Sequence, residues 1–351
     1  MKRARNHIDV MDKVEDTNEP FLCICNSQER LLDSKCPQRI LKVHVHVWLF
    51  FVRTAAFRAI ANNSNIGNSC IFIRLVGEKW MSIILTEKQI DEYLIRIGYR
   101  DEISNNLKTL RTLHTCHTMH VPFENLDVIL GRPISLKIED IYRKIVTDSR
   151  GGYCFELNAL FGSLLTGLGF KVCNYMGRVY QDTNFGGRLH HNMLVWAEGK
   201  QWVVDVGFGG NGLIEPLLFE KNHKKTQFAD LFRLISEDDR FYILQHWHLD
   251  TWHNIYGFSL ESSTQQDYFV GSYYCSTCPS SAFTKKLIIT KPTPTGRVSL
   301  VNNQFSIRKN SKTTLQKNIV SIEEFRKVLA EYFGIATERI ELLEENWFLK
   351  K

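Results

Sequence analysis

Residues 150–158 read RGGYCFELN and place Cys154 directly after a glycine pair and a tyrosine. Beyond the cysteine, leucine and phenylalanine side chains recur at three- and four-residue steps as far as Leu168, and Gly169 follows. This spacing predicts a helix that begins at Cys154 and is closed by Gly169. Glycine permits a tight turn, so the stretch predicts a cysteine presented at a helix start.

A helix start is a favourable position for a reactive thiol. Unpaired N–H groups give the helix N-terminus a partial positive charge, and a neighbouring imidazolium stabilises a thiolate further. We therefore expect a lowered pKa for the Cys154 thiol. A single cysteine is more often a small buried hydrophobic side chain, so the hypothesis of a nucleophile depends on partners elsewhere in the chain.

Two predicted strands, HNMLVWA and KQWVVDVGF, carry candidate partners. They are joined by Glu198-Gly199, which predicts a two-residue hairpin turn. Because side chains alternate between the faces of a strand, this turn places His190 on the same face as Asp205. A turn of odd length would exchange His190 with His191.

An aspartate that accepts a hydrogen bond from one imidazole nitrogen fixes the tautomer and lets the other nitrogen serve a cysteine. Cys154, His190 and Asp205 are therefore a candidate catalytic triad, with His191 as the alternative histidine. The glycine-rich run VGFGG follows Asp205 directly, and its backbone N–H groups would suit a phosphate or an oxyanion. A plain turn is the competing interpretation, since the run lacks the Lys-Ser/Thr of a phosphate-binding loop.

We predict no metal site. Cys275 and Cys278 form an isolated C-x-x-C with no second pair and no nearby histidine, which favours incidental thiols. Three histidines repeat at every third residue and are interpreted as histidines along one helix: His114, His117 and His120.

Composition limits the function classes. The chain is 44% hydrophobic and 23% charged, as is ordinary for a soluble globular protein. Its net charge of +6 forms no dense Lys/Arg stripe, so we expect no nucleic-acid partner. The apolar stretch Val43–Val52 is shorter than the about 20 residues of a membrane span. Nine irregularly spaced cysteines without a secretory signal predict a reducing, cytoplasmic location.

From Met81 onward, the sequence signals for the start and end of helices become regular. Thr86 and Gln89 form a capping box at one predicted helix, and Ser321 and Glu324 form another near the end of the chain. Helical patterns come first, strand patterns follow, and the end is mixed. This order predicts an α+β fold rather than a doubly wound nucleotide fold.

Several motifs together resemble the arylamine N-acetyltransferase family. They are VPFENLDVILGRPI at 121–134, RGGYCFELN at 150–158, VDVGFGG at 204–210, CPSSAF at 278–283 and GRVSL at 296–300. The fifteen-residue spacing from His190 to Asp205, with Gly199 at the turn, also fits the family. The resemblance covers about Met81 to Phe348 and leaves out the first 80 residues.

The resemblance implies a triad of Cys154, His190 and Asp205 and a ping-pong reaction. Acetyl-coenzyme A is then the co-substrate, no cofactor is tightly bound, and the acceptor is an arylamine, an arylhydrazine or a related amine. Phe208 matches the acceptor pocket of the family. Gly209 and Gly210 match its cofactor cleft.

The resemblance also implies a three-part fold with a cysteine-protease-like Cys-His-Asp core. Residues 81–168 would form a helical bundle with the nucleophile, 169–270 an antiparallel β-barrel with the histidine and the aspartate, and 271–351 an α/β lid. Residues 1–80 lie outside the resemblance and would be an atypical extension: a disordered arm, a regulatory extension or the product of a wrong start site.

Two other functions use the same residue types. A papain-like or transglutaminase-like thiol hydrolase also works with Cys-His-Asp chemistry, and a binding module could keep the fold without catalysis. The flanking motifs match the acetyltransferase family and lack the peptidase cysteine signature, so they favour acetyl transfer. The sequence does not identify the amine, the preferred acyl donor or the oligomeric state.

Overall fold

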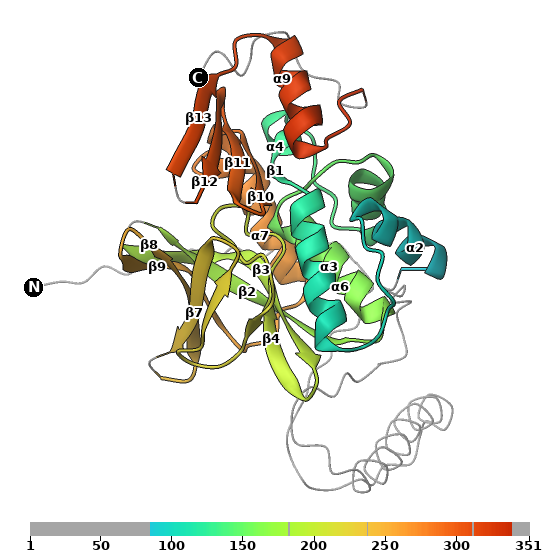
Figure 1. Ribbon diagram of the computed structural model, residues 1–351, viewed down its shortest axis with the longest axis vertical. Helices are drawn as coiled ribbons and strands as arrows, with labels where there is room; N and C mark the ends of the chain where they lie inside the picture. The colour runs from blue at the N-terminus through green and yellow to red at the C-terminus, as the bar shows by residue number, and fades with distance from the viewer. Residues whose placement is uncertain (1–84, 182, 237, 311, 339–351) are drawn as a thin grey trace, which may run out of the picture. The chain divides into compact units, whose positions relative to one another are not determined.

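The computed structural model describes residues 85–181, 183–236, 238–310 and 312–338 (Figure 1). The predictions for residues 1–80, among them that for Val43–Val52, lie outside the described residues. In the part of the chain that is described, no helix is long and apolar enough to cross a membrane. The division of the chain into four domains stays a prediction.

The first part of the described chain is helical. Its helices are α2 (Glu87–Arg96), α3 (Leu107–His120), α4 (Leu126–Ile129), α5 (Ile138–Tyr142) with the π-helical turn η1 (Arg143–Thr147), and α6 (Cys154–Gly167). The predicted capping box is present at α2, where the Thr86 hydroxyl accepts a hydrogen bond from the Gln89 N–H. The predicted helix start at Cys154 is confirmed, and Gly169 follows α6 with a φ of 87°.

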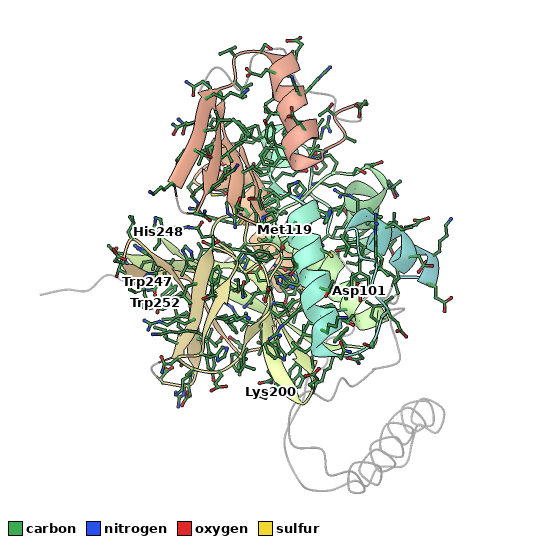
Figure 2. The ribbon with its side chains drawn as sticks, viewed as in Figure 1. Asp101, Met119, Lys200, Trp247, His248 and Trp252 are labelled. Atoms are coloured by element: carbon green, nitrogen blue, oxygen red, sulfur yellow. The ribbon has the colours of Figure 1, made fainter. Side chains whose placement is uncertain are left out.

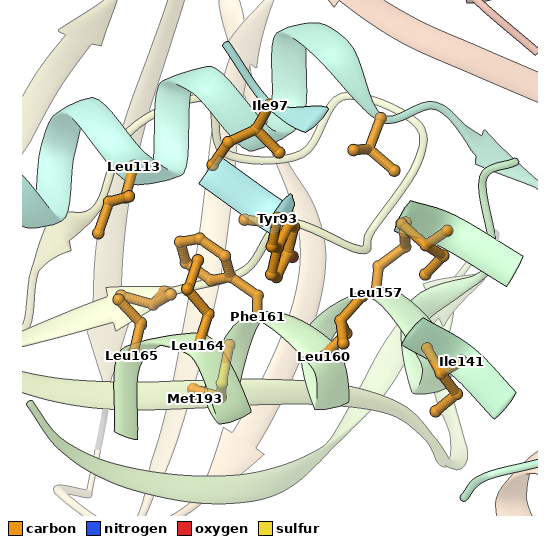
Figure 3. Close-up of a cluster of buried hydrophobic side chains, with 14 of the residues drawn as sticks. Tyr93, Ile97, Leu113, Ile141, Leu157, Leu160, Phe161, Leu164, Leu165 and Met193 are labelled. Carbon is orange, nitrogen blue, oxygen red and sulfur yellow. The ribbon is translucent and has the colours of Figure 1, made fainter. Parts of the chain in front are cut away.

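The apolar stripe of α6 is the centre of the largest core. Leu157, Leu160, Phe161, Leu164 and Leu165 are fully buried. Figure 3 shows them packed among side chains of α2, α3, α5 and β3. Burial of each such side chain stabilises the fold by about 1.5–3 kcal/mol, so the helix that begins at Cys154 is firmly anchored.

A nearly closed, barrel-like antiparallel sheet follows the helices. Its strands lie in the order β5 (Leu217–Leu218), β4 (Lys200–Val204), β3 (Asn184–Ala197), β2 (Lys171–Gln181), β9 (Thr251–Ser259), β8 (Phe241–His248), β7 (Asp230–Ser236) and β6 (Lys224–Gln227). Its own apolar core includes Phe232, Leu244 and Phe258. The predicted antiparallel barrel is therefore present.

The β3–β4 hairpin has the register that the sequence predicts. Ala197 pairs with Lys200, and the turn residues Glu198 and Gly199 have φ values of 51° and 74°. Two positive φ values are the signature of a type I′ turn, which suits the twist of a hairpin. Figure 2 labels Lys200 at this turn, far from the lid.

The second sheet belongs to the lid and has five antiparallel strands. Their order is β1 (Phe123–Glu124), β10 (Ile288–Thr293), β11 (Gly296–Val301), β12 (Gln304–Lys309) and β13 (Lys312–Asn318). Helix α9 (Ile322–Val328) and the turn η2 (Leu329–Phe333) pack on it, and the Ser321 hydroxyl caps α9 by accepting the N–H of Glu324. The predicted capping box is half formed, because the Glu324 carboxylate accepts the N–H of Val320 instead of that of Ser321. The edge strand β1 comes from the VPFEN motif, so the lid sheet recruits residues that precede Cys154.

Two helices link the barrel to the lid. Helix α7 (Gln265–Thr277) lies against β3 and is followed by the short α8 (Ala282–Lys285) (Figure 1). The predicted α+β class, with a helical bundle, an antiparallel barrel and an α/β lid, is confirmed.

We expect Leu164→Ala to lower the free energy of unfolding by about 2–5 kcal/mol, because it leaves a cavity at a fully buried site. The measurement is urea denaturation followed by circular dichroism. The control is Ile95→Ala, whose side chain is 77% exposed on α2, and its effect should stay within about 0.5 kcal/mol. Equal effects of the two substitutions would contradict this core assignment.

Candidate active site

Cys154 is the first residue of α6, and the chain just before it is held closely. Gly151 has no room for a side chain, because a Cβ there would lie 2.2 Å from the carbonyl oxygen of Pro122. The Gly152 carbonyl accepts a hydrogen bond from the N–H of Glu124 at 2.9 Å. The predicted glycine turn therefore lies directly against the VPFEN segment.

A buried ion-pair network fixes this junction. Both Nε and Nη2 of Arg150 donate to Oε1 of Glu124, at 3.0 Å and 2.8 Å, and Arg150 also contacts Asp127 at 3.2 Å. Glu124 of the VPFENL segment is thus the partner of the buried Arg150 cation. Removing one member would leave a buried charge without its partner, so the network is a strong constraint on the local fold.

The structure brings His190 and Asp205 together. Nε2 of His190 lies 2.7 Å from Oδ2 of Asp205, and both side chains are buried. The other oxygen of Asp205 accepts the N–H of Gly207 and the amide of Asn158, each at 2.9 Å. The sequence reasoning did not single out Asn158, although a polar residue four positions after Cys154 on an apolar helix was a visible signal.

Asn158 ties the helix of Cys154 to Asp205 and to the backbone of β3 beside His190. Its Nδ2 also donates to the carbonyl of His191 at 2.6 Å, and its Oδ1 accepts the N–H of Val206 at 2.9 Å. One side chain therefore joins α6, β3 and the loop after β4. Asn158 is fully buried, so these hydrogen bonds are not shared with bulk water.

His191 points to the other face of β3, as the parity of the hairpin predicts. Its Nε2 lies 2.8 Å from Oδ1 of Asn174, and its ring packs against that of Tyr268 with the ring centroids 4.6 Å apart. Burial, with the nearby charge of His190, lowers the pKa of His191 to about 3. His190, and not His191, is thus the histidine beside Asp205.

Cys154 lies next to His190. Its Sγ is 3.9 Å from the carbonyl oxygen of Leu189, and its side chain is 3% exposed. Burial raises the pKa of the Cys154 thiol, and hydrogen bonding and charge from His190 oppose that rise. The expectation of a lowered pKa is wrong for this state of the protein, because desolvation of the thiolate outweighs its stabilisation by the imidazolium.

The charge of Asp205 controls the protonation of His190. Burial by itself lowers the pKa of His190, but the charge and hydrogen bond of Asp205 raise it to about 10. Burial likewise raises the pKa of Asp205, but the imidazolium of His190 brings it below its ordinary value. At neutral pH His190 is therefore an imidazolium, and its positive charge lies beside the Cys154 sulfur.

Aromatic rings surround the imidazole of His190. The ring of Phe208 meets it edge-on, with the two ring centroids 5.3 Å apart, and the centroid of the Tyr256 ring lies 4.7 Å from that of the imidazole. Phe208, which the sequence predicts as a substrate contact, therefore lies beside His190 and is partly buried. Tyr256 comes from β9, and no sequence signal connected it with the site.

The glycine run after Asp205 packs against both the helix and the lid. A Cβ at Gly207 would lie 2.9 Å from Cα of Cys154, so only glycine allows this approach. Gly209 has a φ of 84° and lies against the ring of Phe123, and its carbonyl accepts from Arg297 at 2.7 Å. Gly210 is exposed. Cofactor contact by Gly209 and Gly210 stays a prediction.

The three histidines of α3 have separate partners. His114 contacts the carbonyl of Ile214 at 2.9 Å and the N–H of Asp205 at 3.3 Å, and His117 contacts the hydroxyl of Tyr93 at 2.7 Å. His120 contacts a carbonyl of its own helix. Within the described ranges, no three His, Cys, Asp or Glu side chains converge on a point that could hold a metal ion.

Comparison with known proteins identifies the class of protein that carries this fold. A family model described as N-acetyltransferase matches residues 106–342. The arylamine N-acetyltransferase of Escherichia coli (strain K12) is 34% identical over 252 residues, which cover 71% of this chain and 89% of that protein. Arylamine N-acetyltransferase 1 of Homo sapiens is 30% identical and covers 71% of this chain and 95% of its own.

Solved structures agree. The arylamine N-acetyltransferase of Salmonella typhimurium aligns with a TM-score of 0.70 at 32% identity, covering 73% of this chain and 94% of that one. The Mycobacterium marinum enzyme in complex with CoA aligns with a TM-score of 0.66 at 32% identity, covering 70% and 92%. The chain belongs to the arylamine N-acetyltransferase family.

We expect Asp205→Asn to move the pH dependence of Cys154 alkylation to higher pH by about one unit or more. Loss of the Asp205 charge lets burial lower the pKa of His190, so the imidazolium that lowers the pKa of the Cys154 thiol is absent at neutral pH. The measurement is the rate of iodoacetamide labelling of Cys154 against pH, with the labelled peptide identified by mass.

The matched control is Asp230→Asn, which alters a second buried pair, His246 Nε2 and Asp230 Oδ1 at 2.9 Å. It should leave the labelling profile of Cys154 unchanged. An unshifted profile in Asp205→Asn would refute the proposed electrostatic role of Asp205.

Proposed function

We propose that this N-acetyltransferase works by a ping-pong mechanism through a thioester on Cys154, assisted by His190 and Asp205. The observation that carries the proposal is the buried 2.7 Å contact of His190 with Asp205, beside a cysteine at the start of α6. Acetyl-coenzyme A is the acetyl donor, and an arylamine, an arylhydrazine or a related amine is the acceptor.

In the first half-reaction, Cys154 reacts as the thiolate of a thiolate–imidazolium pair with His190, and the thiolate attacks the acetyl carbonyl carbon. The carbon–sulfur bond to coenzyme A breaks, and its sulfur leaves with the proton from His190. Asp205 stabilises the imidazolium that exists during transfer and fixes the ring by its hydrogen bond to Nε2.

In the second half-reaction, the amine nitrogen attacks the thioester carbon. His190 accepts a proton from the nitrogen, the bond to the Cys154 sulfur breaks, and the sulfur leaves as a thiolate or takes that proton back. The product is the acetylated amine, and the enzyme returns to its starting state. His190 thus acts as an acid toward the coenzyme A sulfur in the first half and as a base toward the amine in the second.

The surroundings of the sulfur favour an amine over water as the acceptor. Cys154 is 3% exposed, and the rings of Phe208 and Tyr256 cover the imidazole. A thioester in such a place is shielded from hydrolysis until an acceptor enters. This shielding, together with family membership, favours transfer over a thiol hydrolase or a binding module without catalysis.

The proposed contacts for the two substrates lie on the loop that follows Asp205. The partly buried ring of Phe208 offers an apolar, aromatic surface next to His190, which suits the ring of an arylamine. Gly209 and Gly210 follow on the same loop and are the proposed contacts for coenzyme A. The Mycobacterium marinum relative has been solved with CoA bound, which supports CoA as the donor class.

The cellular setting is also part of the proposal. Five cysteines in the described ranges are thiols rather than disulfides, which fits a reducing compartment such as the cytoplasm. We propose small-molecule partners only, with neither nucleic acid nor membrane as a partner.

Mixing the protein with acetyl-coenzyme A and no amine should add one acetyl group at Cys154, detected by mass spectrometry of the intact chain and its peptides. The adduct should be absent in Cys154→Ala, and an arylamine added afterwards should remove it. In Asp205→Asn the rate of acetylation should fall by at least about a hundredfold, because the His190 imidazolium that stabilises the Cys154 thiolate and protonates the coenzyme A sulfur is lost at neutral pH.

Cys116→Ser is the control, because Cys116 is a half-buried thiol of α3 outside the site. It should acetylate as the wild type does. An acetyl group that persists in Cys154→Ala, or that forms at full rate in Asp205→Asn, would overturn the proposal.

A further inference from the structure

A second thiol, Cys275, lies beside Cys154 and has no part in the proposed transfer. Its Sγ is 3.9 Å from the carbonyl oxygen of Leu189, and the Sγ of Cys154 lies at the same distance from the same oxygen. The two sulfur atoms are therefore separated by at most twice that distance. Both side chains are 3% exposed, so they share one buried space.

One face of α7 brings Cys275 to this position. The buried residues of α7 are Gly271, Ser272 and Cys275, and Cys275 lies four and three residues after the other two, one helix turn further along the buried side. The hydroxyl of Tyr153 hydrogen-bonds with the Ser272 hydroxyl. A Cβ at Gly271 would lie 2.8 Å from the ring of Phe155, so α7 can approach this closely only because residue 271 is glycine.

The neighbours of Cys154 on both sides thus contact α7, through Tyr153 and through Phe155. Cys275 follows Gly271 by about one helix turn, on the side that faces this segment. Burial raises the pKa of the Cys275 thiol to about 12. In the resting enzyme it therefore keeps its proton and does not compete with Cys154 for an acyl group.

We propose that Cys275 is the resolving thiol of Cys154, which captures the oxidised nucleophile as an intramolecular disulfide. The proposal rests on Cys154 being the reactive thiol of the proposed function. The oxidant is a hydroperoxide small enough to reach the site by the route of the substrates. A disulfide partner is useful here because a sulfenic acid that remains unpaired is open to further, irreversible oxidation.

The chemistry has two steps. The Cys154 thiolate attacks one oxygen of the hydroperoxide, an S–O bond forms, and the O–O bond breaks. The peroxide is reduced by two electrons, and its leaving oxygen takes up a proton as water or an alcohol. The Cys275 sulfur then attacks the sulfenic sulfur, the S–O bond breaks, and the hydroxyl leaves with the Cys275 proton as water.

The resulting disulfide blocks the nucleophile and stores it in a reversible form. Formation of the bond, about 2 Å long, requires the two side chains to turn toward each other from their common position at Leu189. An external thiol can later restore both cysteines by exchange. Acetylation of Cys154 beforehand should prevent the whole sequence, because the thioester sulfur is not a nucleophile toward peroxide.

The test uses the full chain treated with hydrogen peroxide. In the wild type we expect loss of transfer activity, a decrease of two hydrogen masses, and a cross-linked peptide that joins Cys154 to Cys275. Dithiothreitol should restore activity. In Cys275→Ser and Cys275→Ala the same treatment should instead add two or more oxygen atoms to Cys154, and activity should not return.

Cys278→Ser is the matched control, because Cys278 lies three residues beyond Cys275 but is not buried with Cys154. It should behave as the wild type. The proposal is overturned if the wild type accumulates sulfinic acid at Cys154 without the cross-link. It is also overturned if Cys154 pairs with another cysteine, or if the Cys275 variants recover as fully as the wild type.

A separate acetylation measurement distinguishes failure of the proposed function from failure of the resolving-thiol proposal. Untreated wild type and variants are first mixed with acetyl-coenzyme A. Failure of the wild type to take up acetyl at Cys154 counts against the proposed function, whatever the peroxide result. A protein that acetylates normally but forms no Cys154–Cys275 disulfide counts against the resolving thiol alone.

Discussion

The buried carboxylate of Asp205 is the constraint on which the rest of the site depends. A charge in this position is stable only if its oxygens are fully hydrogen-bonded. His190, Asn158 and the N–H of Gly207 provide these bonds, at 2.7, 2.9 and 2.9 Å. Because the donors come from β3, α6 and the loop after β4, satisfying one carboxylate fixes the relative positions of the helical bundle and the barrel.

A second set of buried charges fixes the lid side of the same junction. Arg150 binds Glu124 on the short strand β1, which is the edge of the lid sheet, and Arg297 of β11 donates to the carbonyl of Gly209. The chain on either side of the site is thereby held to the lid. The proposed reactivity depends on this packing, because Asp205 keeps His190 charged and burial keeps water from the Cys154 sulfur.

The sequence predicted the parts of the site that depend on local rules. Two-residue turn geometry and strand alternation placed His190 beside Asp205, and the apolar spacing placed Cys154 at a helix start. Helix α7 was not predicted, because its aromatic residues lie on all sides and Phe269 and Tyr273 are exposed, so no periodic stripe marks it. The burial of Cys154, the raised pKa of its thiol and the neighbouring Cys275 depend on α7, and local patterns could not show them.

The central claim is that acetyl passes through a covalent intermediate on Cys154. The most direct measurement is rapid mixing of the enzyme with acetyl-coenzyme A in the absence of any amine, with the released coenzyme A thiol followed in time. A ping-pong enzyme releases one equivalent per chain in a burst and then stops until an amine is added. Release that begins only when the amine is present would contradict the account.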